Sequence, residues 1–440
     1  MRLLGILTAC AALAGAASDD TFLIRDADVY PVTSAPMKGV SVLVKDGKIA
    51  EIGPKLVAPK GMKVIEAKGL RVYPGMIDSA TQLGLSEVGA VRETVDTGEL
   101  GELMPQLRAI ASVNPDSELF GVARVNGITT AMTYPNAGRG GGRGAGGTQL
   151  ISGQAALIHT SGWTWEDMAV RPSAAVCVQF PALGRGGRGN IPDDILGMLG
   201  EAGPAGSYTQ ALRTYQQQIA KLSDFLEEAR RYQKAKAAHE PGFAPNLKYE
   251  AMLPVLDRKT PLAVSVSSPR TIHDAIAFAE KQNVKIVILQ PRELGSAAAE
   301  LKAKNVPVIL GKPLALPNNE DDAYDEAMAL PEEVHKAGVK FAFGTFDNEF
   351  VRNLPYQAAT AVAFGLPQEE ALKAVTINPA EIWGVGEQVG SIEKGKTADL
   401  VVTSGDMLEI QTQIKHLFIA GKEVSLENKQ TRLYERYMKR

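Results

Sequence analysis

The chain has 440 residues, and its 47 Lys and Arg against 50 Asp and Glu give a net charge of −3. This near balance argues against a nucleic-acid-binding protein, which would carry a basic excess. With 45% hydrophobic and 22% charged residues, the composition is that of a folded protein and excludes an intrinsically disordered one. Two Cys exclude a disulfide framework, and a histidine-built metal site would have to draw on only five His.

The N-terminal segment predicts export. Residues 3–14 form an apolar run too short to span a bilayer, and Ala14-Gly15-Ala16 offers a small-residue cleavage site. We therefore expect residues 1–17 to be a signal peptide and the mature protein to be periplasmic or secreted. Two alternatives are a buried N-terminal helix and a lipid anchor on Cys10, although the segment before Cys10 is short for a lipoprotein signal. No other run is apolar and long enough for a transmembrane helix.

Strand signals gather near both ends of the chain, at residues 22–73 and again at residues 399–424. Within the first segment, Asp46-Gly47 lies between two β-rich runs, a strong hairpin signal because glycine adopts a positive φ without steric cost. Two strand-rich ends around a mixed middle suggest one small domain built from both termini. We expect residues 20–73 and 386–428 to form a composite β-sandwich domain.

Strands and helices alternate in the middle of the chain. Eight strand candidates occupy residues 72–77, 128–134, 155–159, 174–180, 261–265, 285–289, 306–310 and 339–343. Helical patterns occupy residues 207–238, 269–282, 294–304 and 330–337. Because the later strand–helix–strand periods are those of βα units, we predict an α/β fold, with residues 74–385 forming a (β/α)8 TIM-like barrel whose site lies at the carboxyl ends of its strands.

Two Arg-Gly stretches, residues 138–147 and 184–189, each follow a strand candidate and are expected at the barrel mouth. One interpretation is a surface loop kept soluble by arginine. The other is a cradle in which glycine amides and side chains such as Arg139 and Arg143 bind an anionic group of a ligand. A phosphate-binding Walker loop is excluded, because no Gly-Lys-Ser/Thr sequence follows either stretch.

Several blocks resemble the amidohydrolase superfamily, in particular its exported, imidazolonepropionase-like members. The blocks occur in the order of that family, at residues 70–78, 126–130, 376–380, 389–402 and 417–424. The resemblance implies a (β/α)8 barrel with a β-sandwich made from both termini, in agreement with the pattern of elements. It also implies hydrolysis of a C–N bond in a small molecule, such as a cyclic amide, by metal-activated water.

The resemblance further implies a set of metal ligands, from which this chain departs. The family places a His-x-His pair after the first strand, His on the fifth and sixth strands and Asp on the eighth. Here Ala80 and Gln82 stand in the first two positions, residues 261–268 contain no His, and Gln290 stands on the sixth strand. Asp347 comes one residue later than the family's Asp, and one step along a strand reverses the face of a side chain. We therefore predict no metal ligands and no cofactor, where the family would use zinc or another divalent metal.

The five histidines do not rebuild such a site. No two of them have the spacing of a chelating pair. His159 is the only one that ends a strand candidate, while His239, His273, His335 and His416 read as helix-end, helical or outer β residues. His159 is accordingly the first alternative ligand to test.

Carboxylates and amides provide the remaining candidates. Asp347 is the best catalytic carboxylate, whereas Asp78 is expected to make a structural hydrogen bond. Acidic residues between 87 and 102 are expected in a solvated loop, with a cation site built from oxygens as the alternative. For substrate binding we select Gln82, Gln290, Arg139 and Arg143.

Two functions remain open. One is a hydrolase of C–N bonds. The other is a metal-free, inactive relative that binds a small ligand, with an anionic one as an alternative, or pairs with a copy of itself or a related amidohydrolase. Analysis of bound metal would separate them most directly.

Overall fold

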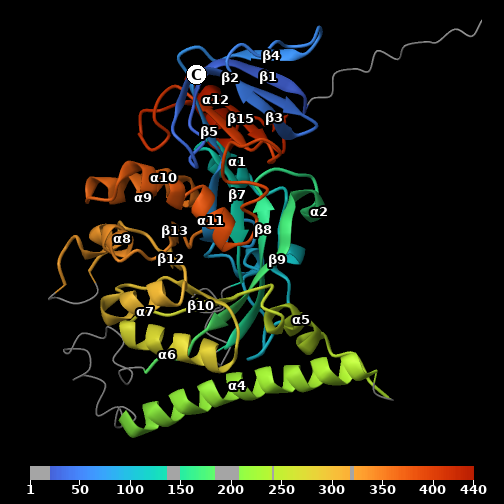
Figure 1. The fold of residues 1–440 in the computed structure, drawn as a ribbon, viewed down its shortest axis with the longest axis vertical. Coiled ribbons are helices and arrows are strands. Elements are labelled where there is room, and N and C mark those ends of the chain that lie inside the picture. The colour runs from blue at the N-terminus through green and yellow to red at the C-terminus, as the bar shows by residue number, and fades with distance from the viewer. Residues whose placement is uncertain (1–19, 136–148, 184–207, 240–241, 318–321) are drawn as a thin grey trace, which may run out of the picture.

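A computed structural model of the chain describes residues 20–135, 149–183, 208–239, 242–317 and 322–440. The expected signal peptide, with Cys10, and both Arg-Gly stretches, with Arg139 and Arg143, lie outside the described residues. The described part is elongated, with one β-sheet at one end and a barrel-like sheet with its helices below it (Figure 1). Among the described residues, no helix is both long and apolar enough to span a membrane.

The first sheet joins the two ends of the chain. Its strands run in the order β16-β15-β14-β5-β1-β2-β3, and β4 pairs with β1. A compact core, in which Phe22 stacks on Phe418 at 4.3 Å between ring centroids, links the N-terminal and C-terminal segments. This confirms the small β domain made from both ends. The strands are β1 (Phe22–Val29), β2 (Met37–Lys45), β3 (Lys48–Gly53), β4 (Lys63–Glu66), β5 (Arg71–Pro74), β14 (Leu400–Thr403), β15 (Ile414–Ile419) and β16 (Lys422–Glu423).

The expected hairpin connects β2 and β3. Asp46 and Gly47 both have positive φ, 49° and 72°, which suits the twist of a two-residue hairpin turn. A Cβ on Gly47 would lie 2.6 Å from the carbonyl oxygen of Ala420. The glycine is therefore needed twice, for the turn itself and for the close approach of the C-terminal hairpin.

The second sheet forms a nearly closed barrel, in the order β13-β12-β11-β10-β9-β8-β7-β6. The two edge strands, β6 and β13, come together at their carboxyl ends. There the amide of Phe346 donates to the oxygen of Ala80 at 2.8 Å, and the amide of Gln82 donates to the oxygen of Asp347 at 3.0 Å. The predicted barrel is thereby confirmed. Its strands are β6 (Met76–Thr81), β7 (Ile128–Thr133), β8 (Ile151–His159), β9 (Ala169–Gln179), β10 (Leu262–Ser265), β11 (Ile286–Leu289), β12 (Val308–Leu310) and β13 (Phe341–Phe343).

Two details of the expected strand pattern were wrong. The segment 72–77 is not one strand, because Gly75 separates β5 of the first sheet from β6 of the barrel. A Cβ at Gly75 would lie 2.0 Å from the Thr129 hydroxyl oxygen, so only glycine fits this crossing. Strand β8 runs antiparallel to both β7 and β9, whereas the other neighbouring barrel strands are parallel.

Helices cover the barrel from outside (Figure 1). The longest, α4, carries many charges and packs against α5, as expected of a solvated helix outside a coiled coil. The helices are α1 (Glu118–Arg124), α2 (Trp165–Met168), α4 (Tyr208–Ala238), α5 (Leu247–Leu256), α6 (Pro269–Lys281), α7 (Ala298–Ala303), α8 (Glu326–Lys336), α9 (Leu354–Ala363), α10 (Gln368–Ala374), α11 (Ile377–Ile382) and α12 (Lys429–Met438).

The barrel interior is apolar. Its buried cluster includes Met132, Leu157, Cys177 and Ile309, closed at one side by Trp383. Burial raises the pKa of the Cys177 thiol to about 12, so this cysteine is an inert core residue rather than a nucleophile. The interior of the barrel is therefore an apolar core that supports the strand ends above it.

Candidate functional site

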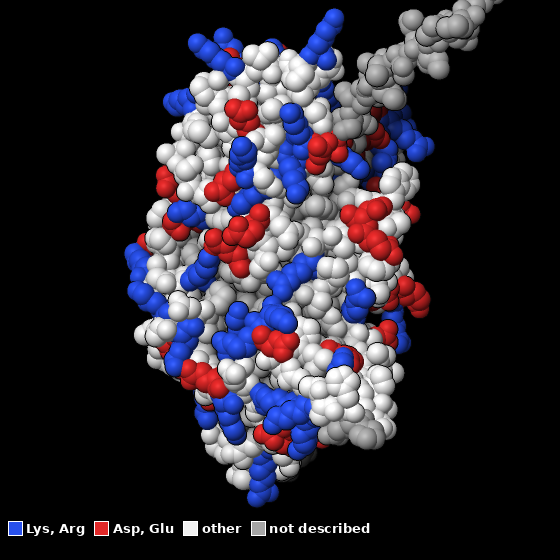
Figure 2. Space-filling view, turned by 45° about the vertical axis from the view of Figure 1, so that its right-hand side comes forward, with Lys and Arg blue, Asp and Glu red and all other residues white. Residues whose placement is uncertain are grey.

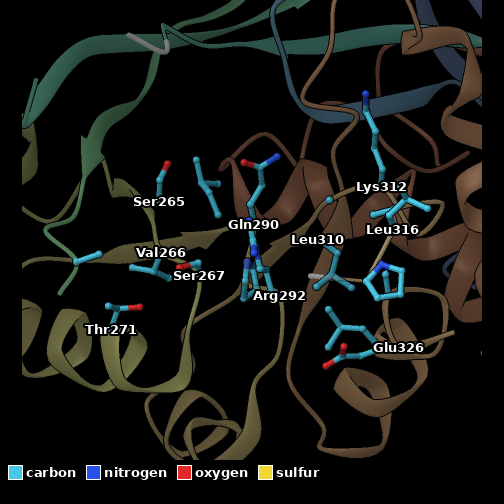
Figure 3. Close-up of a pocket in the computed structure, with 18 of the residues that line it drawn as sticks. Ser265, Val266, Ser267, Thr271, Gln290, Arg292, Leu310, Lys312, Leu316 and Glu326 are labelled. Carbon is cyan, nitrogen blue, oxygen red and sulfur yellow. The ribbon is translucent and has the colours of Figure 1, made fainter. Parts of the chain in front are cut away.

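A cavity of about 840 Å³ opens at the carboxyl ends of β9 to β12, between α6 and α8. This is the end at which barrels of this kind carry their sites, and the volume is that of a small-molecule pocket. Figure 3 shows Thr271 of α6 on one side and Glu326 of α8 on the other, with strand-end residues between them. Apolar walls come from residues such as Phe180, Leu289, Leu310 and Leu330.

Two cations and one carboxylate line this cavity among the described residues, namely Arg292, Lys312 and Glu326. No described residue forms an ion pair with Arg292. Burial and the nearby carboxylates of Asp322, Glu293 and Glu333 raise the pKa of Glu326. The polar lining is completed by amide and hydroxyl groups, from Gln149, Ser152, Gln179, Ser265, Ser267, Thr271, Gln290 and Tyr324.

Gln290 occupies a strained position directly after β11. Its φ is +52°, and its backbone amide donates to the oxygen of Ile309 at 2.9 Å. Bulky residues seldom adopt this conformation, and strain of this kind collects at binding and catalytic sites. In Figure 3 the side chains of Gln290 and Lys312 extend to the same side from neighbouring strand ends. Gln290 thus lines the cavity, and its role in substrate binding stays a prediction.

Asp347 does not line the cavity. One of its oxygens forms an ion pair with Lys312, and the other accepts from the amides of Glu349 at 2.9 Å and Phe350 at 3.2 Å. Although burial raises the pKa of Asp347, the hydrogen bonds from Lys312 and these amides outweigh it, and the pKa is lowered. A carboxylate held this way is a fixed anion that positions Lys312, and it is poorly suited to accept a proton in a reaction.

Phe346 stands where the resemblance places the family's aspartate, directly after Gly344-Thr345. Its φ is +50°, and its ring packs edge-on against Tyr134, with 5.8 Å between centroids. Both rings contact the apolar barrel interior, which also contains Ala80. An aromatic pair therefore packs on the apolar interior directly after β7 and β13, and neither ring lines the cavity.

Asp78 is fully buried and forms hydrogen bonds within the wall of the barrel. It accepts from the amides of Ala80 at 3.2 Å and Thr345 at 3.0 Å, and from the Thr345 hydroxyl at 2.5 Å. Burial raises the pKa of this carboxyl to about 7 despite these hydrogen bonds. Asp78 thus connects β6 to the segment after β13 and does not line the cavity. This position fits the structural hydrogen-bonding role that we expected for it.

The residues at the strand ends do not fit the metal that the family resemblance implies. A zinc site needs about three ligands such as His, Cys or carboxylate in matched geometry. The described residues contain no group of three His, Cys, Asp or Glu placed to hold a metal ion. Among the described residues that line the cavity, the possible ligands are neutral amides and hydroxyls and the single carboxylate of Glu326, while Asp347 lies outside the lining and is paired with Lys312.

His159 lies at the opposite end of the barrel from the cavity. Because β8 runs against its neighbours, the end of this strand is at the foot of the barrel, where His159 Nε2 lies 3.1 Å from the Asp399 carboxylate. The idea that His159 could be a ligand at the mouth was therefore wrong. The physical reason is strand direction, which periodicity does not reveal.

The other histidines contact local partners. His273 lies between Glu300 and the hydroxyl of Ser296, which is 3.0 Å from Nε2, on the outer surface of α6 and α7. His416 pairs with Glu423 at 2.7 Å, and His335 lies 3.9 Å from Glu370. His239 contacts the oxygen of Ala237. None of these four lines the cavity.

The structure thus brings only part of the expected site together. Gln290 lines the cavity, whereas Gln82 and Asp347 do not. Sequence reasoning missed Arg292, Lys312 and Glu326. Arg292 and Lys312 each follow a barrel strand by two or three residues, so a survey of charged residues after every strand would have found them.

Comparison with known proteins agrees with this architecture. The profile of the amidohydrolase family matches residues 202–424. The chain belongs to this family. The amidohydrolase tasK of Hapsidospora irregularis is 23% identical over 437 residues, which cover 91% of this chain but 42% of that relative. The chain therefore spans less than half the length of this relative.

Solved structures show the same fold. An amidohydrolase from Thermotoga maritima is similar with a TM-score of 0.76 and 26% identity, and the match covers 92% of this chain and 99% of that one. A molinate hydrolase structure matches with a TM-score of 0.53 and 17% identity over 92% of this chain and 95% of its own, which shows the fold alone.

Proposed function

We propose that this amidohydrolase-family protein binds a small anionic molecule in the cavity beside the barrel mouth, without catalysis by a family-type zinc centre. The observation that carries the proposal is the replacement of ligand groups at the strand ends by Ala80, Gln82, Gln290 and Phe346, next to a cavity lined by Arg292 and Lys312. The chain keeps the barrel of its family, while the side chains at the barrel mouth suit the binding of an anionic molecule.

Charge and hydrogen bonding favour an anion. Arg292 offers a planar set of N–H donors to a carboxylate or phosphate, and no described residue competes for it as an ion-pair partner. Lys312 retains donors beyond the one given to Asp347. Helix α6 begins at the cavity, and the N-terminal end of a helix adds partial positive charge. Neutral amides such as Gln290 can then fix the orientation of the ligand.

A thermal-shift panel of carboxylates, phosphates and neutral amides of similar size tests this proposal. A ligand at a hundredfold its Kd should stabilise the protein by about 2.7 kcal/mol. Arg292→Ala should weaken the effect of anionic ligands about tenfold or more, because it removes a charge-assisted hydrogen bond. Arg213→Ala, on the exposed face of α4, is the matched control. Equal response to anionic and neutral ligands would refute the proposal.

A second candidate is hydrolysis of a C–N bond in a small molecule. Membership of the amidohydrolase family supports it, as does the similarity to the Thermotoga maritima amidohydrolase. Turnover of cyclic amides or dipeptides by purified protein, together with elemental analysis before and after chelation, separates the two candidates. Activity lost with a stoichiometric metal would favour hydrolysis, and binding without turnover would favour the first proposal.

We also propose that the protein is exported, on the basis of the apolar run at residues 3–14 and the Ala14-Gly15-Ala16 sequence. N-terminal sequencing after expression in a bacterial host should find cleavage near Ala16. An intact Met1 in the cytosol would contradict this, and a lipid on Cys10 would indicate an anchored form. Pairing with a second copy or a related amidohydrolase stays a proposal that light scattering of the purified protein would test.

A further inference from the structure

Helix α12 contacts the protein through the charged side chain of Arg432 and leaves its apolar side open to solvent. It starts with a capping box at Asn428, and none of its residues is buried. Arg432 donates to both carboxylate oxygens of Glu118 on α1, at 2.8 and 3.0 Å, so the polar face is the one that docks. A surface helix of a globular protein normally has the reverse orientation, with its apolar stripe toward the core.

The outward stripe consists of four residues at helical spacing. Leu433 and Tyr437 are four residues apart, as are Tyr434 and Met438, and such pairs share a face. Their exposed fractions are 36% for Leu433, 66% for Tyr434, 53% for Tyr437 and 68% for Met438. The stripe is therefore continuous and largely open to solvent, although Leu433 is partly covered and the Arg440 guanidinium lies 4.7 Å from the centroid of the Tyr437 ring.

The same segment is strongly basic. Between residues 429 and 440 there are five cations, Lys429, Arg432, Arg436, Lys439 and Arg440, against the single carboxylate of Glu435. Of the five cations, only Arg432 forms an ion pair with a described residue. Figure 2 shows several Lys and Arg side chains projecting from the end of the molecule that carries the first β-sheet, the end at which Figure 1 places α12.

We propose that α12 docks on an anionic lipid surface, lying in the plane of the headgroups. Tyrosine is favoured at the boundary between headgroups and acyl chains, and Leu and Met can insert just below it. The cations beside the stripe complement anionic headgroups, and each is expected to strengthen binding severalfold at low salt. Charge argues against a second copy as the occupant, because two such helices face to face would repel.

Vesicle co-sedimentation of the full chain tests the proposal, with phosphatidylcholine vesicles that either contain or lack phosphatidylglycerol. The wild type should sediment with the anionic vesicles, less so at high salt, and poorly with neutral ones. Tyr434→Glu/Tyr437→Glu should reduce binding about tenfold or more, since it places charges in the stripe. Arg436→Glu/Lys439→Glu should reduce binding to anionic vesicles by a similar factor without altering sedimentation with neutral vesicles.

Tyr208→Glu is the matched control, because Tyr208 is 67% exposed on α4 at the other end of the molecule. It should sediment as the wild type does, and all variants should keep the wild-type melting temperature since the altered side chains are exposed. Unchanged sedimentation of both double variants would overturn the proposal. So would a dimer in light scattering that the Tyr434→Glu/Tyr437→Glu variant loses, because a second copy would then cover the stripe.

Discussion

The ion pair between His159 and Asp399 joins the foot of the barrel to the first β-sheet and can be tested directly. His159 ends β8, and its Nε2 lies 3.1 Å from the Asp399 carboxylate, with side-chain exposures of 13% and 4%. The other carboxylate oxygen accepts from the amide of Ala420 at 2.8 Å, and the Asp399 carbonyl accepts from Gly75 at 2.9 Å. Asp399 is therefore held from both sheets.

Replacing His159 with Leu keeps much of the side-chain volume and removes the partner of a buried carboxylate. Removing one partner of a buried pair costs about 3 to 5 kcal/mol. At the lower end of that range the melting temperature should fall by roughly 6 °C, taking about 2 °C per kcal/mol for a large domain. His335→Leu, which loses only a contact at 3.9 Å on a partly exposed helix, should cost far less.

The cost should also depend on pH. Burial by itself lowers the pKa of His159, but the charge of Asp399 and the hydrogen bond to it outweigh burial, so the pKa is raised above 6.5. A raised pKa means that the pair stabilises the fold fully below pH 6.5 and loses this contribution as pH rises through the folded value.

Urea unfolding of wild type and variant at about pH 5.5 and about pH 8.5 measures this dependence. The stability difference between the two proteins should be larger at the lower pH. An equal difference at both pH values would refute the electrostatic argument, and a loss no larger than that of His335→Leu would refute the structural one.

Three further predictions concern the barrel and its mouth. Gly75→Ala should destabilise the fold by about 3 kcal/mol or more in urea unfolding, because a Cβ would lie 2.0 Å from Thr129; wild-type stability would show that the crossing has room. Lys312→Met should lower the free energy of unfolding near neutral pH and make it depend less on pH in acid. The lowered pKa of Asp347 contributes stability above the ordinary pKa of 3.8, and this contribution is lost as pH falls through the pKa in the folded state. An unchanged dependence of stability on pH would contradict this role of Lys312. Elemental analysis of purified protein should find no stoichiometric zinc, and a chelator should leave the melting temperature unchanged. A zinc ion whose removal lowers the melting temperature would show that the chain does hold a metal site.

Local patterns predicted most elements, because each depends on a few neighbouring residues. The Asp46-Gly47 turn follows from the positive φ that its hairpin requires, and the βα period follows from alternating runs of apolar residues. The absence of His at positions 80, 82 and 290 could likewise be read directly, since it concerns which donor atoms are present. The sequence could not show which side chains lie around these positions in the folded protein.

The tertiary structure alone decided how these elements meet. Strand β8 was expected from its residues, but its direction depends on pairing with β7 and β9, and that direction moves His159 to the foot of the barrel. Lys312 and Asp347 form their ion pair across 35 positions of the sequence, so neither flanking segment reveals it. Short-range periodicity thus determined the fold class, and the resemblance of local motifs to the amidohydrolase superfamily identified the ligand types that this chain lacks. The cavity, its cations and the aromatic pair packed on the barrel interior arise from long-range contacts, which form only when distant strand ends are brought to one edge of a closed sheet.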